Sequence, residues 1–294
     1  MRVLVLGASG MLGSAIVRAL SESEGCEVFG TIRSGAAKKF FAPKIAERLV
    51  VGCDVLNEDA LNHVFAEIRP DVLINCISLA KPLLNSGDPL LMIPIYSLLP
   101  HRLARLCDIS GTRMVHISTD GVFSGAKGGY TEDDPFDAKD LYGISKYLGE
   151  VRSPRTIALR TSIIGHELQG ANGLVDWFLS QTESCKGYTR VLYSGLPAVV
   201  LARIIRDFVL PRPDLSGIYH VAARPITKYA LLQLVAQVYG KTINLIEDDS
   251  ITSDRSLSCR HFERATGFVV PEWPELIDAM HADWERANRV TFRT

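Results

Sequence analysis

The chain has 294 residues, 47% of them hydrophobic and 22% charged, a balance typical of a globular protein with a large core. Its 32 basic and 33 acidic side chains give a net charge of −1, which offers no electrostatic basis for nucleic acid or an anionic membrane as the main partner. The first apolar run is too short for a signal peptide, and no run approaches the ~20 apolar residues of a membrane span. Six scattered cysteines without a CxxC pair indicate reduced thiols, so we expect a cytoplasmic protein without a metal site or disulfide framework.

The first half of the chain alternates short β-rich runs with helical patterns. Strands are expected at 2–7, 26–32, 48–55, 71–78, 113–119 and 156–164, and helices at 11–23, 59–68, 100–110 and 141–151. Nearly continuous apolar strands that are separated by helices indicate a parallel sheet buried on both faces. The sequence therefore predicts an α/β fold with a Rossmann-type doubly wound parallel sheet, which binds ligands at the carboxyl ends of its strands.

The pattern becomes less regular after residue 165. Helices are expected at 173–181, 229–240 and 274–288, and a strand at 217–223. We predict an NADP-binding Rossmann domain at 1–164 and a smaller C-terminal substrate-binding lobe at 165–294. Some segments of the lobe, around 190–223, are expected to return to the sheet.

A glycine-rich loop, "GASGMLG" at 7–13, follows the first strand and begins the first helix. Gly7 permits a tight turn, Gly10 lets the backbone approach a pyrophosphate, and Gly13 lets the helix pack closely on the sheet. The free N–H groups and the positive end of the helix would then hold the phosphates. The residues predicted to bind the cofactor here are Gly7, Ser9, Gly10, Met11 and Leu12.

The end of the second strand indicates which dinucleotide binds. Arg33 lies 20 residues beyond Gly13, where NAD enzymes usually carry an acid for the ribose 2′-hydroxyl, and no acidic residue occurs within 28–46. A guanidinium suits a 2′-phosphate, so the sequence favours NADP(H) over NAD(H). Asp54 and Val55, at the end of the third strand, are expected beside the adenine, with Asp54 accepting a hydrogen bond from its amino group.

Tyr142 and Lys146 are four residues apart in the predicted helix 141–151 and share one face of it. A neighbouring ammonium lowers the pKa of a phenol, which is near ~10 in water, so Tyr142 is suited to pass a proton to or from a carbonyl oxygen. Lys146 is also placed to bind the ribose of the cofactor. Thr119, after the fifth strand, is placed to polarise the same carbonyl. These three are the predicted catalytic residues.

Four motifs, "GASGMLG", "STDGVFSG", "YGISK" and "LRTSIIG", resemble in order and spacing the extended short-chain dehydrogenase/reductase superfamily. They are most similar to its dTDP-4-dehydrorhamnose reductase branch of sugar-nucleotide reductases. This resemblance implies that NADPH reduces the 4-keto group of a nucleotide-linked deoxysugar. Tyr142 would donate the proton, Lys146 would tune Tyr142 and hold the ribose, and Thr119 would bind the carbonyl oxygen. Dimers are common in this superfamily, so the resemblance leaves open that the protein forms a homodimer.

The resemblance also implies further binding residues. Those expected at the cofactor are Cys76 and Ile77, in the loop after the fourth strand, and Thr161 and Ser162, beside the nicotinamide. Those expected at the substrate are Ser78, Lys81, Asp120, Val122, Phe123 and Arg255. From its side chain alone, Trp177 is a candidate for stacking on the nucleotide base. His166 lies just beyond the sixth strand. It is expected either to bind a sugar hydroxyl or to make a structural contact within the protein.

Three residues depart from the pattern of this branch. Tyr96 stands where its helix commonly has an asparagine that supports the proton relay, Ile163 replaces a tryptophan, and Gly121 replaces a tyrosine and would open space. Two alternatives therefore remain open. One is a non-catalytic NADP-binding regulatory subunit, similar to the partner of methionine adenosyltransferase. The other is a related sugar-nucleotide epimerase or epimerase-reductase.

Overall fold

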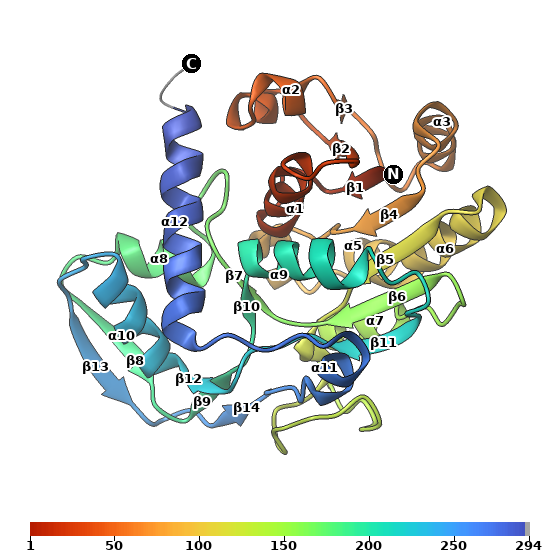
Figure 1. The fold of residues 1–294 in the computed structure, drawn as a ribbon. Coiled ribbons are helices and arrows are strands. Elements are labelled where there is room, and N and C mark those ends of the chain that lie inside the picture. The colour runs from red at the N-terminus through yellow and green to blue at the C-terminus, as the bar shows by residue number, and fades with distance from the viewer. Residues whose placement is uncertain (292–294) are drawn as a thin grey trace.

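The computed structural model describes residues 1–291 and has a seven-stranded parallel sheet at its centre (Figure 1). The strands, in their order across the sheet, are β11 (Gly217–His220), β6 (Thr156–Arg160), β5 (Arg113–Ile117), β4 (Val72–Asn75), β1 (Arg2–Leu6), β2 (Glu27–Ile32) and β3 (Leu49–Val51). Every neighbouring pair is parallel. This arrangement confirms the predicted doubly wound α/β fold. The strand order reverses between β1 and β4, the point at which such sheets bind ligands.

Helices cover both faces of the sheet because strand side chains alternate between the faces. Val3 and Val5 of β1 belong to one apolar core, while Leu4 and Leu6 belong to the other. The first core includes residues of α1 (Met11–Ser21), α9 (Ala198–Ile204) and α12 (Trp273–Thr291), and the second includes residues of α3 (Glu58–Ile68) and α6 (Leu99–Ser110). The sheet is therefore buried on both faces, as its continuous apolar strands predicted.

The six strands expected in the first half are all present, although the third, fourth and sixth each end at least three residues earlier than predicted. The third is shorter than predicted, since β3 ends at Val51. The sixth divides after Arg160, and the short strand β7 (Ile163–Ile164) pairs with β10 (Leu196–Pro197) outside the central sheet. The chain thus leaves the sheet immediately after β6.

Several short helical segments were not predicted. They are η1 (Gly35–Phe40), α2 (Pro43–Ala46), α4 (Lys81–Asn85), α5 (Pro89–Met92), the π-helical turn η2 (Ile93–Leu98) and η3 (Asp120–Val122). Pro89 and Pro94 each stand in the first turn of a new segment, where a missing N–H breaks no helical hydrogen bond. The helix α7 (Leu141–Leu148), which carries Tyr142 and Lys146, was predicted.

The C-terminal half forms small sheets and helices beside the central sheet (Figure 1). Its remaining elements are α8 (Leu174–Ser180), β8 (Ser184–Tyr188), β9 (Val191–Tyr193), η4 (Ile205–Val209), β12 (Ile226–Thr227), α10 (Lys228–Val238), β13 (Asn244–Asp248), β14 (Ser253–Asp254) and α11 (Arg260–Thr266). α12 packs against α9 and α10. The division of the chain at 164/165 stays a prediction. Among the residues described, no helix is long and apolar enough to cross a membrane.

Candidate active site

The glycine loop forms a close-packed turn between β1 and α1. Gly7 has φ +79°, a left-handed conformation that favours glycine, and a Cβ on Gly13 would lie 2.1 Å from the Gly7 carbonyl oxygen. Neither position therefore tolerates a side chain. No side chain caps α1 at Gly10, so N–H groups of its first turn have no side-chain acceptor. That this loop accepts an anionic group on its backbone stays a prediction.

The other residues predicted to bind the cofactor follow strands that end at the same edge of the sheet. The loop after β4 lies against the glycine loop, since a Cβ on Gly7 would be 3.1 Å from the Cys76 carbonyl oxygen. Arg33 and Asp54 are exposed beyond β2 and β3. One carboxylate oxygen of Asp54 accepts a hydrogen bond from the Leu56 N–H (3.0 Å). This oxygen therefore stabilises the turn in which Asp54 lies.

The structure brings Thr119, Tyr142 and Lys146 together beyond the end of β5. Lys146 is buried, and its ammonium donates a 2.6 Å hydrogen bond to the carbonyl oxygen of Ile117, the last residue of β5. Thr119 lies beside Tyr142, since a Cβ on Gly121 would be 3.2 Å from the Thr119 hydroxyl and 3.1 Å from Cε1 of Tyr142. The Thr119 hydroxyl oxygen also accepts a hydrogen bond from the Gly121 N–H at 3.0 Å. A phenol, a hydroxyl and an ammonium thus meet at one strand end.

Burial decides the protonation of this site. It raises the pKa of Tyr142 well above the ordinary value, and the hydrogen bond from Thr119 opposes this only in part. The predicted lowering of the Tyr142 pKa is therefore not found, because burial desolvates the phenolate and the charges of Asp120 and Asp140 also disfavour it. Burial also lowers the pKa of Lys146 to about 8, although Glu150 opposes the shift. At neutral pH Tyr142 holds its proton and Lys146 is charged.

Asp120 lies beside this group and faces cations from the C-terminal half. Burial raises its pKa to about 6, and the charges of Arg255 and Lys228 oppose the rise. Arg255 also has a buried Nε without a hydrogen-bond partner among the residues described. Lys228 was missed in the sequence, because no local pattern links it to a residue more than a hundred positions away.

The other predicted substrate residues, and the predicted cofactor residues Thr161 and Ser162, differ in how far their side chains are exposed. Val122 and Phe123 have no exposed surface, and Phe123 stacks on Tyr130 at 4.1 Å, so the structure does not bring these side chains to a substrate. Trp177 is 41% exposed on α8 and free to meet a planar group. Thr161 is buried, whereas Ser162, after β6, is partly exposed.

Three further residues of interest are the predicted substrate residues Ser78 and Lys81, and Gly121, which was expected to open space. Ser78 and Lys81 are exposed after β4, and the Lys81 ammonium donates to the Asn172 carbonyl oxygen at 2.9 Å. Gly121 does not open the space that its small size suggested. It is buried, and a Cβ there would lie 3.1 Å from Cε1 of Tyr142, so the phenol ring occupies that space.

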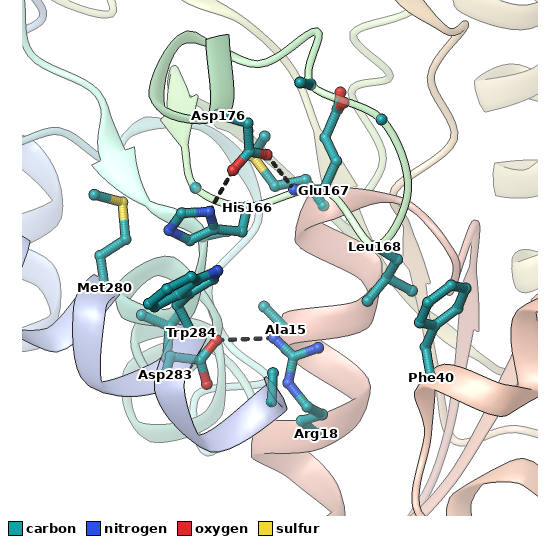
Figure 2. A pocket seen from close by; sticks show the side chains of 17 residues that line it. Ala15, Arg18, Phe40, His166, Glu167, Leu168, Asp176, Met280, Asp283 and Trp284 are labelled. Carbon is teal, nitrogen blue, oxygen red and sulfur yellow. Dashed lines mark hydrogen bonds and ion pairs between the residues drawn. The ribbon is translucent and has the colours of Figure 1, made fainter. Parts of the chain in front are cut away.

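A cavity of about 380 Å³ lies elsewhere, between α1, α12 and the loop that follows β7 (Figure 2). Met11 lines it, but Thr119, Tyr142 and Lys146 do not. His166 forms an ion pair with Asp176 and a 2.7 Å hydrogen bond to the Tyr239 hydroxyl, and the ring of Trp284 lies 5.4 Å away. We call His166, Asp176, Tyr239 and Trp284 the His166 cluster. His166 therefore has structural partners, in agreement with one of its two predicted roles.

Chains of known proteins resemble this one over nearly its whole length. A family model described as RmlD substrate binding domain matches residues 1–285. The methionine adenosyltransferase 2 subunit beta of Danio rerio is 27% identical over 260 residues, which are 81% of this chain and 74% of that protein.

Two solved structures share its fold. A hypothetical dTDP-4-dehydrorhamnose reductase from Sulfolobus tokodaii is 25% identical, with a TM-score of 0.76 over 93% of this chain and 98% of that one. The dTDP-4-dehydrorhamnose reductase of Bacillus anthracis, solved in complex with NADP, is 23% identical, with a TM-score of 0.78 over 96% and 99%. At such identity the second likeness shows the fold alone. Among the described residues, no group of His, Cys, Asp or Glu side chains could hold a metal ion.

Proposed function

The chain belongs to the RmlD substrate binding domain family, and from this premise we propose that it is an NADPH-dependent reductase of nucleotide-linked 4-keto-deoxysugars. The observation that carries the proposal is the meeting of Thr119, Tyr142 and Lys146 at the carboxyl edge of the sheet. A protonated phenol beside a charged ammonium is the pair that reduction of a ketone requires from the protein.

The residues present fit a bound NADP(H). The close-packed glycine loop leaves room for a pyrophosphate against its backbone, and Arg33 is exposed at the end of β2, where a 2′-phosphate would lie. The NADP complex of the Bacillus anthracis reductase supports the same choice. Lys146, next to the loop that follows β4, would hold a ribose hydroxyl.

When bound, NADPH supplies the hydride that reduces the carbonyl carbon. The side chains of the site act on the carbonyl oxygen. Thr119 donates a hydrogen bond to it, since among the described residues its proton is held only by the Asp120 carboxylate at 3.3 Å, a weak hydrogen bond. Tyr142 transfers its phenolic proton to the oxygen as negative charge develops there. Lys146 stabilises the phenolate that remains, so ketone, hydride and proton together give the alcohol, and the phenolate stays paired with a cation.

A panel of substrates tests this proposal. The purified protein is incubated with NADPH and 4-keto-6-deoxysugars linked to dTDP, GDP, UDP or CDP, and oxidation of the cofactor is followed. We expect turnover with at least one of them and its loss in Tyr142→Phe. If none is reduced although NADPH binds, the proposal fails. Deuteride transfer followed by NMR of the product separates simple reduction from epimerisation with reduction.

Arg33 tests the choice of cofactor separately. Arg33→Ala is expected to raise the KM for NADPH about tenfold, because one charged hydrogen bond to a phosphate is lost, and to leave the KM for NADH unchanged. Arg48, exposed on the surface and paired with Glu27, provides the matched control. Equal effects of Arg33→Ala on both cofactors would contradict a 2′-phosphate site.

A second candidate function is that of a non-catalytic NADP-binding subunit. The observation that favours it is the similarity to the Danio rerio methionine adenosyltransferase subunit over 81% of this chain. The test is to mix the protein with a methionine adenosyltransferase catalytic subunit and measure complex formation by size-exclusion chromatography. A stoichiometric complex without any reductase activity would favour this candidate, whereas turnover without a complex would exclude it.

A further inference from the structure

Tyr96 lies in the π-helical turn η2 and packs directly against the helix that carries Tyr142 and Lys146. Gly149 permits this close approach, since a Cβ there would lie 1.9 Å from the Tyr96 carbonyl oxygen. The neighbouring Ser97 donates a 3.0 Å hydrogen bond to the Ser145 carbonyl oxygen. Single π-helical turns inside helices occur often at functional sites. Tyr96 and Ser97 therefore both contact α7 or the glycine that ends it.

The ring of Tyr96 contacts both members of the catalytic pair. Its centroid is 5.4 Å from that of the Tyr142 ring at an interplanar angle of 83°, an edge-to-face contact. The Lys146 ammonium lies 5.4 Å from the same centroid. Tyr96 is 1% exposed, so this cation–π contact is shielded from water, where such contacts are strongest.

Lys146 needs such a contact because it is a buried cation. Its hydrogen bond to the Ile117 carbonyl oxygen uses one of three ammonium donors. The face of an aromatic ring carries partial negative charge and stabilises a cation without accepting its proton. The ring of Tyr96 thus favours the charged form of Lys146, against the desolvation that lowers the pKa of this side chain.

The hydroxyl of Tyr96 points to a different element, the loop after β4. It accepts a hydrogen bond from the Leu79 N–H at 2.9 Å and lies 3.1 Å from the Ser78 hydroxyl. This loop lies against the glycine loop through Cys76 and Ile77. One side chain therefore contacts the catalytic pair with its ring and the cofactor side of the site with its hydroxyl.

We propose that Tyr96 is a positioning residue with two separable roles: its ring holds Lys146 charged and Tyr142 in place, and its hydroxyl fixes the Ser78–Leu79 loop for cofactor binding. The inference deepens the proposed reductase function and rests on it. Its two readouts nevertheless need no sugar substrate. The first is the pKa of Lys146, obtained from the pH dependence of its acylation rate, which mass spectrometry measures. The second is the affinity for NADPH, measured by fluorescence titration.

Two substitutions separate the two roles. Tyr96→Leu removes the ring, and the Lys146 pKa is expected to fall by about one unit, with acylation near neutral pH faster by up to about tenfold. Tyr96→Phe keeps the ring, so Lys146 titrates as in the wild type. Losing the hydroxyl leaves the Leu79 N–H unpaired, and NADPH binding is expected to weaken about fivefold. Where turnover is measurable, Tyr96→Leu lowers kcat, whereas Tyr96→Phe mainly raises the KM for NADPH.

Ser97→Ala is the matched control, because it loosens the same turn from α7 without touching Lys146. A merely structural role of the turn would lower the melting temperature in all three variants and leave the Lys146 titration unchanged in each. If Tyr96→Leu does not fold, Tyr96→Met, which fills more of the space, replaces it. An unchanged Lys146 titration without the ring, or an equal shift in Tyr96→Phe, overturns the ring's role. Unchanged NADPH affinity in Tyr96→Phe overturns that of the hydroxyl.

Discussion

Two polar clusters in this protein lie in different parts of the fold and have different partners. In the catalytic cluster (Thr119, Asp120, Tyr142 and Lys146), burial shifts the pKa of each titratable group toward its neutral form. In the His166 cluster, the imidazole faces the Asp176 carboxylate (Figure 2), and its other nitrogen is hydrogen-bonded to the Tyr239 hydroxyl. Burial raises the pKa of Tyr239 in the second cluster as well, but there the phenol and the carboxylate both contact the same imidazole.

This difference indicates what each cluster does. Shifted pKa values occur in both clusters, so their positions distinguish them: the catalytic cluster stands at the carboxyl ends of the strands, where such sheets bind ligands. The His166 cluster joins the loop after β7 to α8, α10 and α12, which are far apart in the chain. We therefore expect substitutions to affect turnover in the catalytic cluster and stability in the His166 cluster.

The largest effect is expected for Tyr142→Phe, which removes one hydroxyl from the catalytic cluster. Turnover should fall about 10³-fold, because the proton donor to the carbonyl oxygen is lost. NADPH affinity should stay within about twofold, since the ring and the glycine loop remain. Steady-state kinetics and fluorescence titration measure the two quantities.

Tyr239→Phe makes the same chemical change in the His166 cluster and serves as the matched control. It removes the hydroxyl that bonds His166, so it should lower the free energy of unfolding by about 1 kcal/mol and leave kcat unchanged. If both tyrosines affected kcat equally, the distinction between the clusters would collapse.

The pH dependence of turnover gives the next largest effect. Lys146 has a pKa of about 8, so raising the pH through this value removes the charge that stabilises the Tyr142 phenolate. We expect kcat/KM to fall above pH 8 by about tenfold per pH unit. Tyr142 itself stays protonated over this range, because burial raises its pKa. A profile that stays flat up to pH 10 would show that the Lys146 charge is not needed.

The sequence predicted the first half of the fold well because its signals are local. Apolar strands, the glycine loop and the spacing of Tyr142 and Lys146 each depend on a few adjacent residues, and parallel strands bring their ends to one edge whatever the details. The convergence of Thr119 with this pair followed from the same rule. The central sheet and the core of the candidate site were thus accessible from motifs alone.

What the sequence could not predict depends on contacts between distant segments. The pKa of Tyr142 depends on burial by elements that surround it, and the prediction considered only its neighbour on the helix. Phe123 lies in a motif but packs in a core with Tyr130, and the charge of Lys228 acts on Asp120 from another part of the chain. Strands of two or three residues, such as β7 and β10, carry too little pattern to be recognised.

A smaller effect, on stability, is expected for Asp176→Asn in the His166 cluster. The substitution breaks a mostly buried ion pair and weakens the hydrogen bond that the Glu167 N–H donates to Asp176 at 2.9 Å. The free energy of unfolding should fall by about 2 kcal/mol, with kcat within twofold of the wild type. Urea unfolding and kinetics test this, with the exposed Asp249→Asn as the control. A loss of kcat in the folded variant would assign catalytic importance to this cluster.

The smallest effect has the opposite sign and is expected for Lys146→Met. The folded-state pKa of about 8 lies below the value of about 10.4 for an unfolded lysine, so the unfolded state binds more protons between these values. The cost of burying the charged side chain is therefore complete below pH 8, decreases as the pH rises and is absent above about 10.4. That cost, about 2–3 kcal/mol, exceeds the about 1–2 kcal/mol that is lost with the hydrogen bond to Ile117.

Lys146→Met should consequently be more stable than the wild type by about 1 kcal/mol at pH 7, although it has lost turnover. The advantage should shrink as the pH rises from 8 and reverse near 10.4, where only the missing hydrogen bond remains. Urea unfolding at several pH values measures this difference, and Lys241→Met, which removes a partly buried lysine far from the site, is the control. If Lys146→Met were less stable at every pH, the contacts of Lys146 would outweigh its desolvation, and the two clusters would be alike in stabilising the fold.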